Sequence, residues 1–169
     1  GLLALLSPGA ALDVGSGDGV IARLLAPRAS HSTCLDQSQV VIDAARARLS
    51  ARTNVSFDVG DMHRLPYGDA SFDQVLLLHV LTYSQDPVQA LREAARVLRP
   101  GGLLVASTLA RHEHETISST YGHLNTGLHP DELATAADAV GLRVQQCGVS
   151  SRERKAPFFD ILTLVAEQD

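Results

Sequence analysis

The feature that most constrains this chain is a glycine-rich turn, Asp13-Val14-Gly15-Ser16-Gly17-Asp18-Gly19, between a short apolar stretch and a helix-like one. Three alternating glycines let the backbone turn sharply, adopt positive φ and approach a ligand without side chains in the way. A turn of this kind, leaving a strand and opening a helix, is typical of the cofactor site of a doubly wound α/β sheet. The turn therefore predicts that fold class and a ligand at the loop.

The details of the turn argue against a dinucleotide. The dinucleotide pattern Gly-x-Gly-x-x-Gly, counted from Gly15, needs a third glycine where this chain has Val20. The turn also carries two carboxylates, Asp13 and Asp18, which would repel a pyrophosphate at a helix start. S-adenosylmethionine, which has an ammonium and a sulfonium group and no phosphate, fits better and is the predicted cofactor. A nicotinamide oxidoreductase is correspondingly disfavoured.

Composition predicts one ordinary domain over residues 1–169, in which 45% of residues are hydrophobic and 20% charged. The net charge of −5 argues against nucleic acid or an anionic membrane as a partner of this domain. No apolar run of about 18 residues and no signal peptide is present, so we expect no membrane association. Cys34 and Cys147 lack metal-ligand spacing and are predicted to be free thiols in the cytoplasm. Because the chain opens at Gly1 without a methionine, we expect that a preceding segment is missing.

Strand-like and helix-like stretches alternate along the chain. The periodicity predicts strands at 10–14, 33–35, 55–59, 72–78, 103–108, 142–149 and 158–166, and helices at 20–27, 38–51, 86–99 and 130–140. The apolar stripe of the third helix is expected to include Val88, Leu91, Ala95 and Leu98, with Pro100-Gly101-Gly102 as its end. Five β-α repeats and two adjacent closing strands predict a seven-stranded, mostly parallel sheet whose last strand is antiparallel.

Four motifs in order carry a resemblance that extends over essentially the whole chain. They are the segment Ala11–Gly19, Asp36 after the second strand with Gly60-Asp61-Met62 after the third, Phe72–Val75, and Arg96–Gly102 before the fifth strand. With them the chain resembles class I S-adenosylmethionine-dependent methyltransferases of the small-molecule type, which include ubiquinone and menaquinone methyltransferases. The resemblance implies the Rossmann-like methyltransferase fold. The segments 86–102 and 109–115 are also similar to the methyltransferase domain that follows an ArsR-type winged-helix module in some bacterial proteins. This second resemblance implies a missing N-terminal module, with which the start at Gly1 is compatible.

The resemblance implies roles for the residues of the turn. Asp13 would order the loop and the ammonium end of the cofactor, directly or through water; alternatively its carboxylate merely caps loop amides. Gly15, Ser16, Gly17 and Gly19 would let the backbone approach the methionine part of the cofactor.

Polar residues after the second and third strands are predicted to bind the adenosine. Asp36 follows Gly15 by 21 residues, close to the spacing at which a carboxylate accepts hydrogen bonds from both ribose hydroxyls. It could also cap the helix that follows. Gln37 is expected to border the adenosine, Asp61 to accept from the adenine amino group, and Met62 to face the ring unless it simply packs in the core.

The fourth and fifth strands are predicted to lead into the acceptor site. His79 ends the fourth strand, where it could line the cofactor or act as a general base, although many methyltransferases work mainly by alignment. Tyr83 is a candidate pocket wall, and His112 belongs to a polar segment, 111–129, predicted to cover the site. His112 and His114 show no helical i, i+4 spacing, so we predict no metal site.

These observations predict an enzyme that transfers a methyl group from S-adenosylmethionine to a small-molecule acceptor. The alternative is a sensor or regulatory domain of a transcriptional regulator that binds the cofactor with little or no turnover. The acceptor itself, and the atom methylated, are not indicated by the sequence. Its expected place is between segment 111–129 and the residues from His79 to Tyr83.

Overall fold

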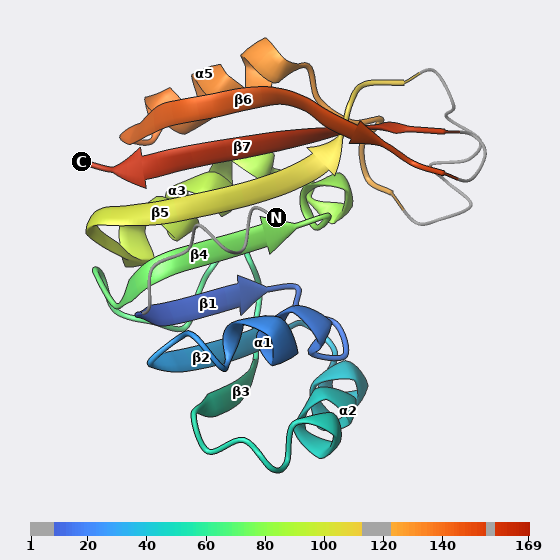
Figure 1. The fold of residues 1–169 in the computed structure, drawn as a ribbon. Helices are drawn as coiled ribbons and strands as arrows, with labels where there is room; N and C mark the ends of the chain where they lie inside the picture. Colours follow the sequence, from blue (N-terminus) through green and yellow to red (C-terminus); the bar gives the residue numbers. More distant parts are fainter. Residues whose placement is uncertain (1–8, 113–122, 155–157) are drawn as a thin grey trace.

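The computed structural model describes residues 9–112, 123–154 and 158–169, which form one twisted sheet with helices against both faces (Figure 1). The strands are β1 (Ala10–Val14), β2 (His31–Asp36), β3 (Val55–Val59), β4 (Phe72–Leu78), β5 (Leu98–Leu109), β6 (Leu142–Arg152) and β7 (Asp160–Gln168). Neighbouring strands pair in parallel except for β7, which is antiparallel to both β5 and β6. The predicted seven-stranded, mostly parallel sheet with an antiparallel last strand is confirmed.

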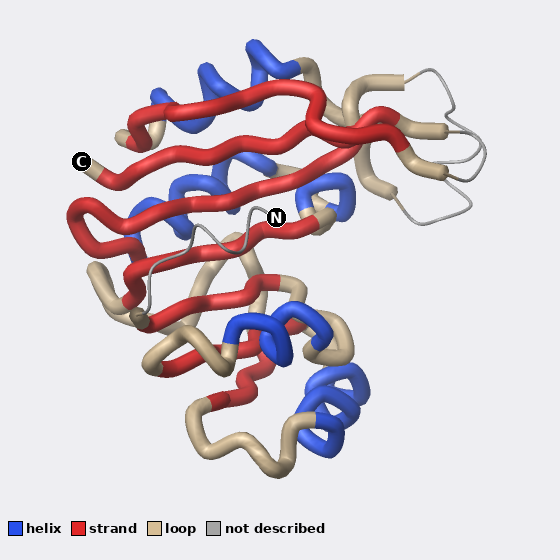
Figure 2. The backbone as a smooth tube through the Cα atoms, viewed as in Figure 1, coloured by secondary structure: helices blue, strands red, loops and turns tan. Residues whose placement is uncertain are grey.

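The strand order is β3-β2-β1-β4-β5-β7-β6. The order in which strands are added to the sheet reverses between β1 and β4, which makes this central position the topological switch point. From β1 the chain moves outward to β2 and β3, then crosses back to β4 on the other side of β1. Figure 2 shows the strands as a continuous central layer between the helices. At such a switch point the loops after the two central strands diverge, which opens a crevice at their carboxyl ends.

The helices divide between the two faces of the sheet. Their bounds are α1 (Val20–Leu25), α2 (Gln39–Arg48), α3 (Pro87–Val97) and α5 (Pro130–Ala139). Buried side chains of α1 and α2 pack with the strands on one face, whereas those of α3 and α5 pack together on the other. Both faces of β4 are therefore covered, as its near-continuous apolar sequence predicts.

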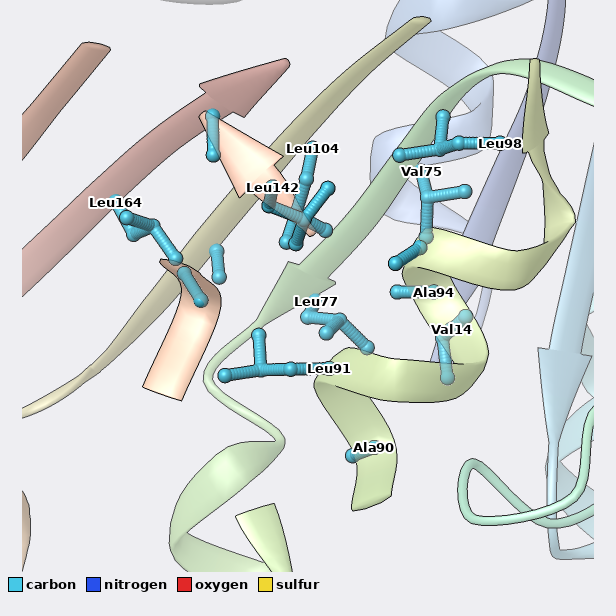
Figure 3. Packing of buried hydrophobic residues seen from close by; sticks show 14 of the residues in the cluster. Val14, Val75, Leu77, Ala90, Leu91, Ala94, Leu98, Leu104, Leu142 and Leu164 are labelled. Atoms are coloured by element: carbon cyan, nitrogen blue, oxygen red, sulfur yellow. The ribbon is translucent and has the colours of Figure 1, made fainter. Parts of the chain in front are cut away.

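The larger core lies between the sheet and helices α3 and α5. Figure 3 shows Leu77 of β4 and Leu91 of α3 in this cluster, with Leu142 and Leu164 of the last two strands. Helix α3 begins as predicted, because the Asp86 carboxylate accepts from the Gln89 amide at 3.0 Å and a proline occupies the first turn. Truncating a fully buried leucine such as Leu91 typically costs about 2–5 kcal/mol.

Two details of this helix differ from the expectation. It ends at Val97, and Leu98 is already the first residue of β5 although it was expected on the apolar stripe of the helix. The side chain of Val88 is 37% exposed and lies outside the stripe, which is formed by Ala90, Leu91, Ala94 and Ala95. Leu98 is extended because it pairs with Phe72 of β4. This contact between distant segments cannot be predicted from the helical spacing of apolar residues.

The number of β-α repeats was also overestimated. Residues 60–71, between β3 and β4, form a loop rather than a helix. Glu93 of α3 holds this loop, because its buried carboxylate accepts from the Leu65 amide at 2.8 Å. Arg96 donates to the Leu65 carbonyl at 3.1 Å and to the Tyr67 carbonyl at 2.8 Å. Side chains of a neighbouring helix thus satisfy backbone groups that a helix would satisfy internally. Among the described residues, no helix has the length and apolar character needed to cross a membrane.

Candidate cofactor and active site

A cavity of about 360 Å³ opens at the carboxyl ends of the central strands. This volume falls within the range common for small-molecule sites. The cavity lies at the switch point between β1 and β4, where the fold predicts a ligand. Its lining consists of Val14, Gly15, Leu35, Asp36, Gln37, Gly60, Met62, Leu78, His79, Val80 and Tyr83.

Only Val14 and Gly15 of the glycine turn line the cavity, and the predicted residues Asp13, Ser16, Gly17 and Gly19 are not part of its lining. The three glycines of the turn adopt positive φ, as expected. The amides of Gly15 and Ser16 both donate to the Leu35 carbonyl, at 2.7 and 3.0 Å, which ties the turn to β2. Gly15 has φ of +69°, and a Cβ there would overlap the Val80 side chain. Gly17 has φ of +55°, and a Cβ there would meet no atom within 4 Å. The turn therefore packs tightly at its first glycine and leaves open space at its second.

Asp13 lies beneath the turn and is nearly enclosed. Its side chain is 3% exposed, and among the described residues Oδ2 has no hydrogen-bond partner. Burial raises the pKa of this carboxyl to about 7, and the nearby Asp36 adds to the effect. A buried carboxylate without a partner is costly, so this position favours a cationic ligand group that would compensate it. The ammonium group of S-adenosylmethionine is such a group.

Asp18, the other acid of the turn, is engaged elsewhere. Its carboxylate forms an ion pair with Arg48 of α2 at 2.7 Å. The expectation that both carboxylates face the ligand is therefore wrong for Asp18, and the charge argument against a pyrophosphate depends on Asp13. The pairing joins the turn to α2, a contact between distant segments that the local sequence does not reveal.

Asp36 links the turn to the end of β2. Its Oδ2 accepts from the Gly17 amide at 3.2 Å, and its Oδ1 accepts from the Ser38 amide at 3.0 Å. The cap of α2 is Ser38, whose hydroxyl accepts from Val41, so the alternative of Asp36 as the helix cap is wrong in detail. A carboxylate has lone pairs for about four hydrogen bonds, so Asp36 retains capacity for the hydroxyls of a ribose. Gln37 is exposed beside it and lines the cavity.

A second cavity, of about 440 Å³, adjoins the first on the side of β3. Its lining consists of Gln37, Asp61, Met62, His63, Tyr83, Gln85, Asp86, Gln89 and Leu124. Gln37, Met62 and Tyr83 also line the first cavity, so the two are neighbours. Met62 also packs against the large core, which supports the packing alternative, and its contact with the adenine ring stays a prediction.

Asp61 is exposed on this side and held by the residue two positions later. Its Oδ1 accepts from the His63 amide at 2.9 Å and from His63 Nδ1 at 2.7 Å. The hydrogen bond from the His63 amide is the main reason that the pKa of the Asp61 carboxyl lies below its usual value. Asp61 is thus an ionised acceptor at the rim of the cavities at neutral pH.

His79 lies at the end of β4 in an unusual backbone conformation. It has φ of +59°, in the left-handed region that few non-glycine residues occupy, and its amide donates to the Ser107 carbonyl at 2.9 Å. His79 is exposed and is one of the residues that line the first cavity. Partial burial nevertheless lowers the pKa of its imidazole, with an opposing effect from Glu153. A neutral imidazole can accept a proton, so the group is in the form that a general base requires.

Part of the polar segment lies at the same edge of the sheet as the glycine turn. The Leu124 amide donates to the Thr82 carbonyl at 2.7 Å, next to the short 3-10 helix η2 (Leu81–Tyr83) that follows β4. The Asn125 side chain donates to the Leu81 carbonyl at 2.8 Å. His123 contacts the Tyr83 ring edge-on, with 5.2 Å between ring centroids. Residues 123–125 are therefore placed over the end of β4, as expected, whereas residues 113–122 lie outside the described part of the chain.

His112 is placed away from the two cavities. Its ring packs against Phe159 with 4.3 Å between centroids, and its amide donates to the Thr126 carbonyl at 3.0 Å. It is not among the residues that line either cavity, so its proposed contact with the acceptor stays a prediction. His114 lies outside the described residues. Within the described ranges, no group of three or more His, Cys, Asp or Glu residues could hold a metal ion.

Comparison with known proteins assigns the family. The model of the methyltransferase domain matches residues 12–106, which include the glycine turn and the strands around both cavities. The chain belongs to the methyltransferase domain family. The predicted family is confirmed with it, and S-adenosylmethionine is the cofactor of such domains. Three features fit that cofactor: the buried Asp13, whose Oδ2 has no partner in the described part of the chain, the open space at Gly17, and the acids after β2 and β3.

Relatives of known sequence include several methyltransferases. The chain is similar to methyltransferase GfsG of Streptomyces halstedii, with 31% identity over 89% of this chain and 61% of that protein. It is also similar to a malonyl-[acyl-carrier protein] O-methyltransferase of Serratia marcescens, with 31% identity over 76% of this chain and 51% of that protein. The chain thus spans about half to two thirds of these relatives' length. No relative named here tests the resemblance to winged-helix-linked methyltransferases or the single-domain organisation, which stay predictions.

Solved structures share the fold of this methyltransferase domain. A methyltransferase solved in complex with the Trm112 methyltransferase activator of Haloferax volcanii has a TM-score of 0.86 and 25% identity, covering 98% of this chain and 85% of that one. The [4+2]-cyclase SpnF has a TM-score of 0.84 and 23% identity, covering 99% and 79%. A cyclase among the neighbours shows that the fold does not fix the reaction by itself.

Sequence reasoning missed several residues of this methyltransferase site. Leu78, Val80 and Gly60 line the first cavity because they end or follow β4 and β3, a position that strand boundaries could have indicated. His63 and Leu124 line the second cavity, where only tertiary folding brings them together.

Proposed function

We propose that this domain transfers a methyl group from S-adenosylmethionine to a small-molecule acceptor at the edge of the sheet formed by the ends of β1, β2 and β4. The observation that supports this most directly is the cavity at Gly15 and Asp36 in a chain that belongs to the methyltransferase domain family. Close to it in sequence is the buried Asp13, whose Oδ2 has no partner among the described residues.

Residues in and near the two cavities are proposed to recognise different parts of the cofactor. Asp13 would receive the ammonium group, since a cation there offsets the cost of a buried carboxylate. Gly17 would let the methionine part approach the backbone. Asp36 would accept from the ribose hydroxyls, with both its oxygens already oriented by the Gly17 and Ser38 amides. Asp61 would accept from the adenine amino group, and Met62 would face the ring.

The acceptor is proposed to enter between Tyr83 and residues 123–125. Tyr83 lines both cavities and is 45% exposed, and the His123 ring contacts its ring edge-on. The bound cofactor supplies a methyl group on a positively charged sulfur, which a nucleophile can attack directly. The protein's part is then chiefly to align the acceptor and exclude water, and such alignment alone can supply a large share of the rate.

His79 is the proposed proton acceptor for acceptors that carry a proton on the attacking atom. Its imidazole faces the first cavity, and its lowered pKa keeps it neutral at physiological pH. Its backbone is fixed by the hydrogen bond to β5, so the imidazole is presented from a rigid position. Acceptors that attack through an already ionised atom would not need it.

The test is turnover. Purified protein is incubated with S-adenosylmethionine and a panel of small phenols, amines, thiols and carboxylates, and formation of S-adenosylhomocysteine is followed. We expect acceptor-dependent formation with at least one chemical class. Tight binding of the cofactor without turnover for any class would instead favour the sensor alternative, which the comparisons do not favour. The same assay on a Tyr83→Ala variant should raise the acceptor KM more than the cofactor KM.

A further inference from the structure

The loop after β3 and the segment after β4 are joined by a hydrogen-bonded chain of three side chains. His63 Nδ1 lies 2.7 Å from Asp61 Oδ1, and His63 Nε2 lies 2.7 Å from the Ser84 hydroxyl. The Ser84 hydroxyl also accepts from the Asp86 amide at 3.1 Å. Ser84 is 1% exposed, so the far end of this chain is buried while Asp61 is 65% exposed at the cavity rim.

The donor and acceptor roles of Asp61, His63 and Ser84 are mutually consistent. Because the Asp86 amide donates to the Ser84 hydroxyl, that hydroxyl can give its own proton to His63 Nε2. A neutral His63 then carries its proton on Nδ1 and donates it to Asp61. Every group in the chain is satisfied in this arrangement. The Asp61 carboxylate, which can only accept, places the proton of a neutral His63 on Nδ1, and the buried Ser84 hydroxyl matches this tautomer by donating to Nε2.

The arrangement also orients the Asp61 carboxylate. Both hydrogen bonds that it accepts from described residues fall on Oδ1, one from the His63 amide and one from the ring. Oδ2 accepts none from the described residues and lies on the exposed side chain that lines the second cavity. A carboxylate fixed through one oxygen presents the other in a defined direction, which a freely rotating exposed aspartate would not do.

We propose that His63 is a positioning residue for recognition of the adenine base. It fixes Asp61 so that Oδ2 meets the amino group of the adenine, and Ser84 matches the donor form of His63 by donating to Nε2. This inference rests on the proposed function, since it requires the adenosine to lie between Asp36 and Asp61. Its consequence is selectivity for a 6-amino purine over a 6-oxo purine, because a carboxylate oxygen accepts from an amino group and repels a carbonyl oxygen.

Calorimetric titration with S-adenosylhomocysteine and with S-inosylhomocysteine, which has a 6-oxo group, tests the proposal. For the unchanged protein we expect tighter binding of the adenine ligand by about 10-fold or more, the usual effect of a hydrogen bond to a charged group. His63→Ala should reduce this preference to about 3-fold or less. The loss should fall on the adenine ligand, whereas damage to the fold would weaken both ligands.

Two conservative variants distinguish the contribution of His63 Nδ1 from that of His63 Nε2. His63→Asn places an amide donor near the position of Nδ1, so it should keep most of the preference, whereas His63→Gln reaches toward Ser84 and should lose it. His31→Ala is the matched control. His31 Nε2 makes an equally short 2.7 Å contact with the Ser56 hydroxyl, but His31 is the first residue of β2, at the end of the strand away from Asp36. It should leave the preference unchanged.

The outcomes are distinguishable from failure of the proposed function. If neither ligand binds the unchanged protein, the proposed function fails. If the adenine ligand binds but His63→Ala keeps the full preference, or His63→Asn loses as much of it as His63→Ala, the positioning role is overturned while the proposed function stands.

Discussion

Replacing the buried Asp13 by asparagine should stabilise the free protein and weaken cofactor binding. The pKa of the Asp13 carboxyl is raised from 3.8 to about 7, so the folded state binds a proton that the unfolded state releases. The folded state is therefore favoured at low pH and loses stability as pH rises between these two values. Asparagine has the same shape and no charge to lose, so the variant should lack this dependence.

The magnitude follows from the two pKa values. The full shift of roughly 3 pKa units corresponds to about 4 kcal/mol at a pH well above 7. Between pH 5 and pH 8 the unchanged protein should lose about 2–3 kcal/mol that the variant does not lose. Urea unfolding at the two pH values measures this difference. Asp43→Asn, on an exposed part of α2, is the matched control and should show no such difference.

Binding should respond in the opposite direction. An ammonium group beside Asp13 favours the ionised carboxylate, so binding of S-adenosylhomocysteine releases a proton below pH 7 and the affinity rises with pH up to about 7. Asp13→Asn should bind more weakly and with little pH dependence. Titrations in buffers of different ionisation enthalpy report the proton release. A variant that is no more stable at pH 8, or an affinity independent of pH in the unchanged protein, would refute the reasoning.

Three further substitutions test separate parts of the account. Asp36→Ala should weaken S-adenosylhomocysteine binding by about 1.5–3 kcal/mol without unfolding the protein, since the residue is at a strand end; an unchanged affinity by calorimetry would show that the ribose lies elsewhere. His79→Asn, which keeps a side chain that tolerates the left-handed backbone, should lower turnover about 10-fold or more while the affinity for S-adenosylhomocysteine changes little; normal turnover would exclude His79 as the base. Glu93→Ala should lower the free energy of unfolding by about 2–3 kcal/mol at neutral pH, because the Leu65 amide and Arg96 lose their partner. Since Arg96 lowers the pKa of the Glu93 carboxyl, the difference from the unchanged protein should shrink as pH falls through that lowered pKa; a constant difference down to pH 3 in denaturant titrations would contradict this assignment.

Local sequence was sufficient for most of the fold and for the cofactor loop. Alternating glycines, the Asp86-Pro87 helix start and the apolar run of β4 each report a local physical requirement, and the structure places them as expected. The antiparallel β7 followed from two adjacent strands without a crossover helix. These features depend on backbone geometry and on the period of apolar residues, both of which are visible in a single sequence.

The remainder depends on contacts between distant segments. The ion pair of Asp18 with Arg48 and the hold of Glu93 on the loop after β3 arise only when helices pack beside loops. The chain from Asp61 through His63 to Ser84 spans two loops that share no local motif. β5 begins as early as Leu98 because this residue pairs with β4, and that pairing is favoured over continuing the helix.

The most direct test of the central claim is a calorimetric titration of this chain with S-adenosylhomocysteine, with NAD titrated separately under the same conditions. The account predicts one saturable site for S-adenosylhomocysteine, lost or strongly weakened in Asp36→Ala, and no binding of NAD. Clear binding of NAD together with no detectable binding of S-adenosylhomocysteine would contradict it.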